Sequence, residues 1–214
     1  LGVYTPGTNF NTKSQTNTNC IMCIWLDKKE RTLLNKNPTI ICGMSCIDVL
    51  NGSSYIFQFK EDYFHNPTTY DEIERFHTIY NPCELIIIYS GFSKNEIEDI
   101  IRFCKLNSLK KHIISTNDTE NIYNVQINNY EKQAFQTNLL QKFFSTKDWN
   151  FFYQYCQFKK YPFATQSFCF LLEFVYTHNP NLIKQIFEPQ IENINKYLIL
   201  ANHSLKQLNV QKSG

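Results

Sequence analysis

The sequence predicts an α/β domain with a mixed sheet and flanking helices, followed by an all-α segment. Apolar runs bounded by polar residues predict strands in the first half, and apolar residues at helical spacing alternate with them. From Asn129 onward the strand pattern gives out. We therefore assign residues 1–127 to the α/β domain and 128–214 to an incomplete helical domain. Because no low-complexity linker separates the two parts, we expect them to pack together.

The predicted strands are short and apolar. The run from Cys20 to Leu26 is continuous and bounded by polar residues, which is typical of a buried strand. The dipeptide Asn51-Gly52 predicts a hairpin turn, so the strands over 39–50 and 53–60 should pair in antiparallel fashion. The other predicted strands are Val3 to Thr5, Leu85 to Tyr89 and His112 to Ser115.

Capping residues and periodicity predict the helices. Thr69 is the expected N-cap of a helix over 70–80, with acidic residues in its first turn and Pro82 beyond its end. Ser93 and Glu96 form a capping box that opens a helix over 96–106. Apolar residues at helical spacing predict five further helices, over 131–144, 149–158, 164–177, 182–186 and 201–208.

Composition and charge exclude several classes of protein. The net charge is only +2, so the composition does not indicate a strongly basic DNA-binding surface. We interpret the lysine pairs at 28–29, 110–111 and 159–160 as solvated. No apolar run is long enough to span a membrane, and Leu1-Gly2-Val3 does not resemble a signal peptide. We therefore expect a protein of a reducing intracellular compartment, without membrane contact, whose 8 cysteines are reduced and buried.

Candidate chemical sites are few. The candidate zinc ligands are Cys20, Cys23, Cys42 and Cys46. However, Cys20 and Cys23 lie three apart in a strand, so they should point to opposite faces of the sheet. Cys104 falls on the apolar face of its helix, and no phosphate-binding G-x-x-x-x-G-K-[ST] motif is present. We predict no catalytic, cofactor-binding or metal-binding residue in this chain.

Short signatures along the chain resemble the MutS family of DNA mismatch-repair proteins. Val3-Tyr4-Thr5-Pro6-Gly7-Thr8 resembles the entrance to the family's connector domain, and Leu198 to Val210 resembles the start of its core, or lever, region. Three intervening segments resemble connector strands and a core helix: Cys42 to Val49, Pro82 to Ile86 and Ala164 to Tyr176. Departures from the family pattern at 166–169 and 202–204 indicate a divergent branch. The long polar loop over 9–19 and the bias toward Asn, Ile and Lys resemble MutS homologues of giant viruses and coral mitochondria.

This resemblance implies a ribonuclease-H-like connector over 1–127 and the start of the core over 128–214. It implies an internal fragment of a mismatch-recognition ATPase that is not itself an enzyme. The connector would relay conformational change between the ATPase and mismatch-binding domains and offer a docking surface to a MutL-like protein. ATP, Mg²⁺ and mismatched DNA would bind other domains of the parent, a dimer or higher oligomer located in a viral factory, the cytoplasm or a mitochondrion.

Two alternatives stay open. A ribonuclease-H-like sheet also suits a metal-dependent nuclease, for which Asp48 and Glu84 are the candidate ligands. Asp48 has a competing interpretation, as a strand-end residue that bonds to the Asn51-Gly52 turn. The other alternative is a stand-alone protein-binding adaptor. Phe59-Lys60-Glu61 matches the family's mismatch-reading Phe-x-Glu, but it follows the connector signature, so we interpret the match as chance.

Overall fold

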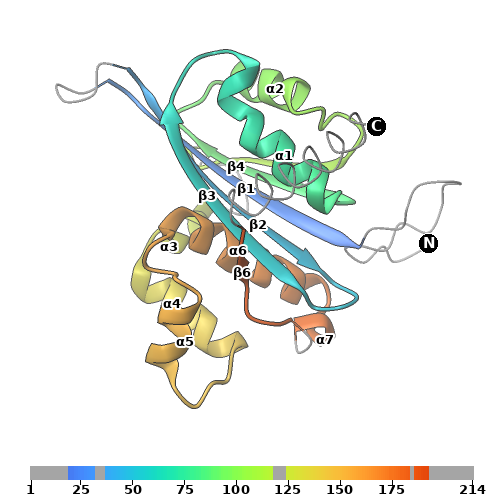
Figure 1. Cartoon of the computed structure of the whole chain (residues 1–214), viewed down its shortest axis with the longest axis vertical. Helices are drawn as coiled ribbons and strands as arrows, with labels where there is room; N and C mark the ends of the chain where they lie inside the picture. Colours follow the sequence, from blue (N-terminus) through green and yellow to red (C-terminus); the bar gives the residue numbers. More distant parts are fainter. Residues whose placement is uncertain (1–18, 32–36, 118–123, 184–185, 193–214) are drawn as a thin grey trace, which may run out of the picture.

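A mixed sheet forms the centre of the molecule (Figure 1). The structure is a computed structural model that describes residues 19–31, 37–117, 124–183 and 186–192. Among these residues the strand order is β5-β4-β1-β2-β3-β6. The strands are β1 (Cys20–Lys29), β2 (Thr39–Asp48), β3 (Ser54–Asp62), β4 (Glu84–Ser90), β5 (Lys110–Ser115) and β6 (Gln190–Ile191). The two signatures at the ends of the chain, the strand expected over 3–5 and the helix expected over 201–208 lie outside the described residues.

Strand pairing is both antiparallel and parallel. β1, β2 and β3 form an antiparallel meander, whereas β4 pairs in parallel with β1, β5 with β4, and β6 with β3. The predicted hairpin joins β2 to β3: Gly52 N donates to Asp48 O at 2.9 Å, and Gly52 has φ +77°, a conformation that glycine adopts without a steric cost. The prediction of an α/β fold with a mixed sheet is confirmed.

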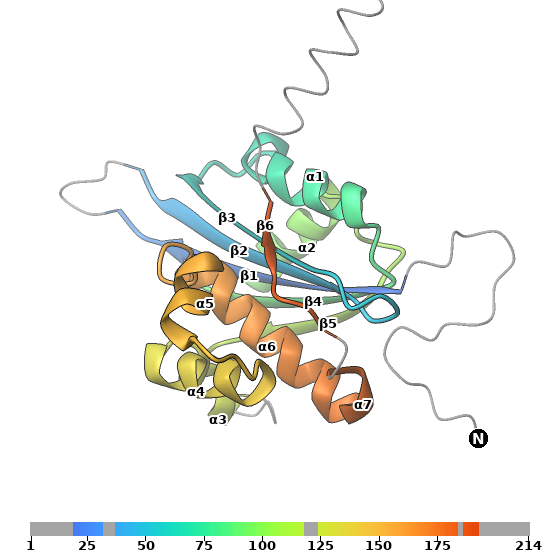
Figure 2. The ribbon, with the colours of Figure 1, turned by 60° about the horizontal axis from the view of Figure 1, so that its bottom comes forward.

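Helices cover both faces of the sheet (Figures 1 and 2). One face carries α1 (Asp71–Tyr80) and α2 (Lys94–Phe103). The opposite face carries α3 (Asn124–Tyr130), α4 (Gln133–Phe143), α5 (Trp149–Tyr155) and α6 (Pro162–His178), and α7 (Pro180–Ile183) follows α6. β1 is buried on both sides, which explains its continuous apolar run: Ile24 faces α1 and α2, and Trp25 faces the other layer.

The two parts of the chain pack together as expected. α6 lies across β1 and β2, and its Phe168 and Leu171 share one core with Ile21 and Trp25 of β1. The proposed boundary between residues 127 and 128 falls within α3 and stays a prediction. The strand β6, which lies in the segment expected to be helical, was not predicted, because two residues are too few to show a periodicity.

Several helix boundaries differ from the predicted ones; the helix expected over 149–158, for example, ends at Tyr155, and the one expected over 182–186 is α7, Pro180–Ile183. Thr69 is not the N-cap of α1; Asn66 caps a 3₁₀ turn, η1 (Pro67–Tyr70), that precedes the helix, and its side chain accepts from Thr69 N at 3.3 Å. Helix α2 begins at Lys94, directly after its cap Ser93. It ends at Phe103 rather than 106, because Lys105 has φ +58° and cannot continue a helix.

Within the described residues, none of the helices combines the length and the apolarity needed to cross a bilayer.

Candidate functional site

Asp48 serves the hairpin turn, as one of its two interpretations predicted. Its carboxylate accepts hydrogen bonds from Leu50 N at 2.9 Å and from Asn51 Nδ2 at 2.8 Å. Its own backbone N donates to Ser53 O at 2.9 Å. The side chain is therefore engaged in closing the turn between β2 and β3.

Glu84 lies on the other face of the sheet from Asp48. Glu84 is aligned with Ile21, which faces the α6 layer, whereas Asp48 is aligned with Cys20, which packs toward α1 and α2. Glu84 is 3% exposed, and its carboxylate lies 2.7 Å from both Lys110 Nζ and His112 Nε2. Burial raises its pKa, but the hydrogen bonds from His112 and Lys110 outweigh burial and leave the pKa below its usual value. The structure therefore does not bring the two nuclease candidates together.

The four candidate zinc ligands are divided between the two faces. Cys23 belongs to the core under α6, whereas Cys42 and Cys46 belong to the core under α1 and α2, which Cys20 also contacts. The prediction that Cys20 and Cys23 point to opposite faces is confirmed. No group of three or more potential ligands arranged to hold a metal ion occurs in the part of the chain that the structure describes.

Phe59 of the Phe-Lys-Glu match is a core residue. It is 8% exposed on β3, where its ring lies 6.2 Å from that of Phe57. A buried ring cannot insert into a base stack without unfolding this part of the sheet, so the position supports the interpretation of a chance match.

Two of the three lysine pairs contain one lysine that is not solvated as predicted. Lys28 has a side chain only 12% exposed that is paired with Glu96, and Lys111 Nζ donates to the carbonyls of Leu106, Asn107 and Leu109 at 2.8–3.1 Å. These two lysines support loops and helices, because their long stems can reach buried or local acceptors. Lys159 and Lys160 are exposed, as predicted.

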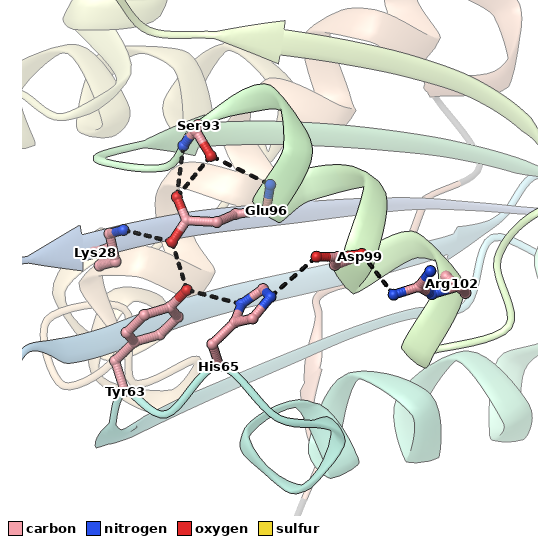
Figure 3. Close-up of polar contacts among 7 residues, drawn as sticks. All are labelled: Lys28, Tyr63, His65, Ser93, Glu96, Asp99 and Arg102. Atoms are coloured by element: carbon pink, nitrogen blue, oxygen red, sulfur yellow. Dashed lines mark hydrogen bonds and ion pairs between the residues drawn. The ribbon is translucent and has the colours of Figure 1, made fainter.

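A polar network centred on Glu96 lies at the carboxyl ends of β1 and β4 (Figure 3). Glu96 Oε1 accepts from Lys28 Nζ at 2.7 Å and from Tyr63 OH at 2.5 Å. Glu96 Oε2 accepts from Ser93 N at 2.7 Å, which completes the predicted capping box. Burial raises the pKa of Glu96, but the bonds from Lys28, Tyr63 and Ser93 outweigh burial and lower that pKa to about 2.

The network continues along α2. Tyr63 OH lies 3.3 Å from His65 Nδ1, His65 Nε2 lies 3.0 Å from Asp99 Oδ2, and Arg102 donates to Asp99 at 2.7 Å (Figure 3). We call this set of seven residues the Glu96 network. In α/β proteins, ligands often bind at the carboxyl ends of the strands, which is where this network lies. Here the charged groups are paired with one another, so the network ties β1, the segment after β3 and α2 together.

The start of α6 is joined to the sheet by a close backbone approach. A Cβ on Gly43 would lie 2.1 Å from the backbone C and O of Phe163, so only glycine fits there without a shift of the helix. Gln58 is aligned with Gly43, and its Oε1 accepts from Phe163 N at 2.8 Å and Ala164 N at 3.2 Å. A side chain of β3 thus satisfies two N–H groups that the first turn of a helix leaves unpaired.

One turn further along α6, hydroxyl groups continue the junction. Ser167 Oγ donates to Cys23 O at 2.9 Å and lies 2.8 Å from Ser45 Oγ. Ser45, Ser167 and Cys23 are all 0% exposed, so these bonds are made in the core. We define the α6 junction as Gly43, Ser45, Gln58, Phe163, Ala164 and Ser167. It attaches α6 to β1, β2 and β3 through directional contacts.

Neither the Glu96 network nor the α6 junction could be predicted as a whole from the sequence. The capping box was visible from local spacing, but Lys28 and Glu96 are 68 residues apart. Ser167 lies in the segment that departs from the family pattern, and its hydroxyl makes a buried contact to β1. A Gly at the centre of an apolar strand was the available signal for the close approach at Gly43.

These observations define a class of protein: an α/β domain fused to a helical layer, whose polar groups mainly hold its own elements together. No family model matches the chain. The chain is similar to a protein of Acanthamoeba polyphaga mimivirus whose name describes it as a DNA mismatch repair protein and mutS homolog. The two are 26% identical over 230 residues, which cover 100% of this chain and 20% of the relative. This confirms the predicted resemblance to the MutS family, in a divergent branch like that of giant viruses.

Proposed function

We propose that this chain is the connector and the start of the helical core of a DNA mismatch-recognition ATPase. It relays conformational change between the ATPase and mismatch-binding domains and catalyses no reaction itself. The observation that carries this proposal is the similarity to the mimivirus mutS homolog along the whole chain, which spans 20% of that relative. ATP, Mg²⁺ and mismatched DNA bind other domains of the parent, which assembles as a dimer or higher oligomer and recruits a MutL-like partner.

The strand arrangement supports this proposal. An antiparallel meander, β1 to β3, is extended on the β1 side by the parallel strands β4 and β5. This arrangement is compatible with the ribonuclease-H-like sheet expected of a connector. The positions of Asp48 and Glu84 on opposite faces do not favour the nuclease alternative.

The internal contacts support a relay. A module that transmits motion needs elements that move as one body, because strain spreads through close-packed and directionally bonded contacts. The α6 junction joins the helical layer to three strands, and the Glu96 network joins α2 to β1. Displacement of α6 by the following core region therefore shifts the sheet as well.

Fluorescence anisotropy with matched and mismatched duplexes tests the proposal on the chain itself. We expect weak binding that does not distinguish the two duplexes, since mismatch reading belongs to another domain. Glu61→Gln, which alters the exposed carboxylate of the Phe-Lys-Glu match, should leave binding unchanged. A clear preference for the mismatch, or Mg²⁺-dependent cleavage that disappears in Asp48→Asn, would contradict the proposal.

A further inference from the structure

The last described segment of the chain forms a strap along the edge of β3. We define the strap as residues 187–192, which include β6, and Figure 2 shows β6 beside β3. β6 pairs with β3 through only two residue pairs, whereas β5, at the other edge of the sheet, pairs with β4 along all six of its residues. The main-chain pairing that holds the strap is therefore small.

Two hydrogen bonds hold the start of the strap to the β2–β3 hairpin. Phe187 N donates to Gly52 O at 2.9 Å, and Ser54 Oγ donates to Phe187 O at 2.9 Å. The Phe187 ring is exposed, so it adds little buried apolar area. Ile186, directly before the strap, is buried in the core under α6 and fixes the position at which the strap begins.

Glu192 holds the other end of the strap. Its backbone N donates to Ile56 O at 2.9 Å. Its carboxylate accepts a hydrogen bond from the hydroxyl of Tyr80, the last residue of α1, and lies 3.7 Å from Arg75 Nη1. Because Glu192 is buried, these interactions are stronger than they would be in water. We call Glu192, Tyr80 and Arg75 the Glu192 latch.

A pocket lies between the strap and the helical layer. Its volume is about 620 Å³, and it is lined by the strap itself, by Ser53 and Ser54 beside the hairpin and by Tyr155 and Gln157 near the end of α5. The strap therefore lacks close packing on this side, and its attachment depends mainly on the bonds at its two ends.

We propose that the strap is a separable unit that opens locally, and that the Glu192 latch controls this opening. Segments with few apolar contacts open at a lower cost than the strands of a core. When the latch breaks, the strap leaves β3 while the other strands stay paired. One part of this inference rests on the proposed function, which assigns the residues after Glu192 to the helical core. A displacement of that core then acts on the latch and, through Tyr80, on α1.

Hydrogen exchange of backbone amides, followed by peptide mass spectrometry, tests the opening in the unaltered chain. The amides of Phe187 and Glu192 are hydrogen-bond donors within the strap. Peptides covering 187–192 should exchange about tenfold faster than peptides covering β1 and β4, or faster still, because local opening exposes the strap alone. If the strap exchanges as slowly as β1, it opens only with the whole sheet and the proposal is overturned.

Two variants assign the latch. Glu192→Ala removes the carboxylate, whereas Tyr80→Phe removes the donor and keeps the ring that packs against Tyr55 and Phe76. Each should speed exchange in the strap about tenfold, the lower end expected for loss of a hydrogen bond to a charged group, and leave β1 and β4 unchanged. Glu188→Gln is the matched control, since Glu188 lies in the strap and is exposed, and it should change nothing.

A double variant tests whether the two residues act through each other. Because Tyr80 bonds to Glu192, the double variant should exchange no faster than the faster single variant. Multiplied effects, or equal acceleration in β1 and β4, would overturn the latch. If Glu192→Ala does not fold, Tyr80→Phe decides the question. The measurement uses no DNA, so a mismatch preference seen by anisotropy would contradict the proposed function and leave the opening of the strap unaffected.

Discussion

At the scale of single residues, Glu96 combines a local role with a long-range one. One carboxylate oxygen closes the capping box with Ser93, and the other binds Lys28 and Tyr63 from different elements. Lys28 also lies 4.9 Å from the centre of the Tyr63 ring and 5.1 Å from that of Phe92. The carboxylate and the ring faces take the place of water around this largely buried ammonium group.

The charge of Glu96 should make folding stability depend on acid pH. Because its folded pKa is lowered to about 2, the stabilisation is complete above the unfolded pKa of about 4.3 and is lost as the pH falls toward 2. Glu96→Gln should cost about 1–2 kcal/mol at pH 6, allowing for solvent screening at this partly exposed position. Urea midpoints of the two proteins should converge as the pH falls from 5 to 2.

Glu98→Gln is the matched control, since Glu98 is on the same helix and exposed. It should shift the midpoint little at any pH. If the difference between Glu96→Gln and the unaltered chain does not change with pH, the carboxylate does not stabilise the fold through its charge.

At the scale of elements, α6 depends on a cap supplied by another strand. Its N-cap position, Tyr161, makes no side-chain capping hydrogen bond, and Pro162 occupies the first turn. Gln58 of β3 accepts from the first free N–H groups instead. The first N–H groups of α6 have an acceptor only when the helix lies at this position over the sheet. This requirement favours one docking geometry of α6.

Gln58→Ala should therefore destabilise the protein by about 1–3 kcal/mol, because it leaves the N–H groups of Phe163 and Ala164 without an acceptor. Gln58→Glu keeps the acceptor and places a negative charge near the positive end of the helix, so it should retain most of the stability. Urea unfolding followed by circular dichroism measures both. Equal losses in the two variants would mean that the side chain acts by packing alone.

At the scale of the whole molecule, the sheet and the helical layer share a core. Trp25 of β1 contacts Tyr130 of α3 and Phe170 of α6, with ring centres 6.4 and 6.5 Å away. Trp149 of α5 packs on the same core from its outer side. A common core of this kind favours a single cooperative unfolding transition rather than two.

The two tryptophans allow that expectation to be measured. Trp149→Phe leaves Trp25 as the only tryptophan, and Trp25→Phe leaves Trp149 as the only tryptophan. In each single-tryptophan protein, the urea transition seen by fluorescence should coincide with that seen by far-ultraviolet circular dichroism. Separate transitions would show that the sheet and the helical layer unfold as independent units, and a rigid relay would then lose its support.

The sequence by itself determined the elements whose signals are local. The strand from Cys20, the Asn51-Gly52 hairpin and the Ser93–Glu96 capping box all occur where predicted, because each depends on residues a few positions apart. The short strand β6 was not predicted, because its signal is not local. β6 has two residues, and its pairing depends on β3, which precedes it by more than 100 positions in the chain.

Only the tertiary structure decided which distant residues meet. Asp48 and Glu84 were the two candidate metal ligands of a nuclease. They do not meet, because the register of β1 with β2 and β4 places them on opposite faces of the sheet. The pairing of Lys28 with Glu96 and the approach of Phe163 to Gly43 arise because separate elements are stacked on one sheet. Local sequence patterns determine backbone conformation. Contacts between distant residues depend on strand order and register, which no short stretch of sequence specifies.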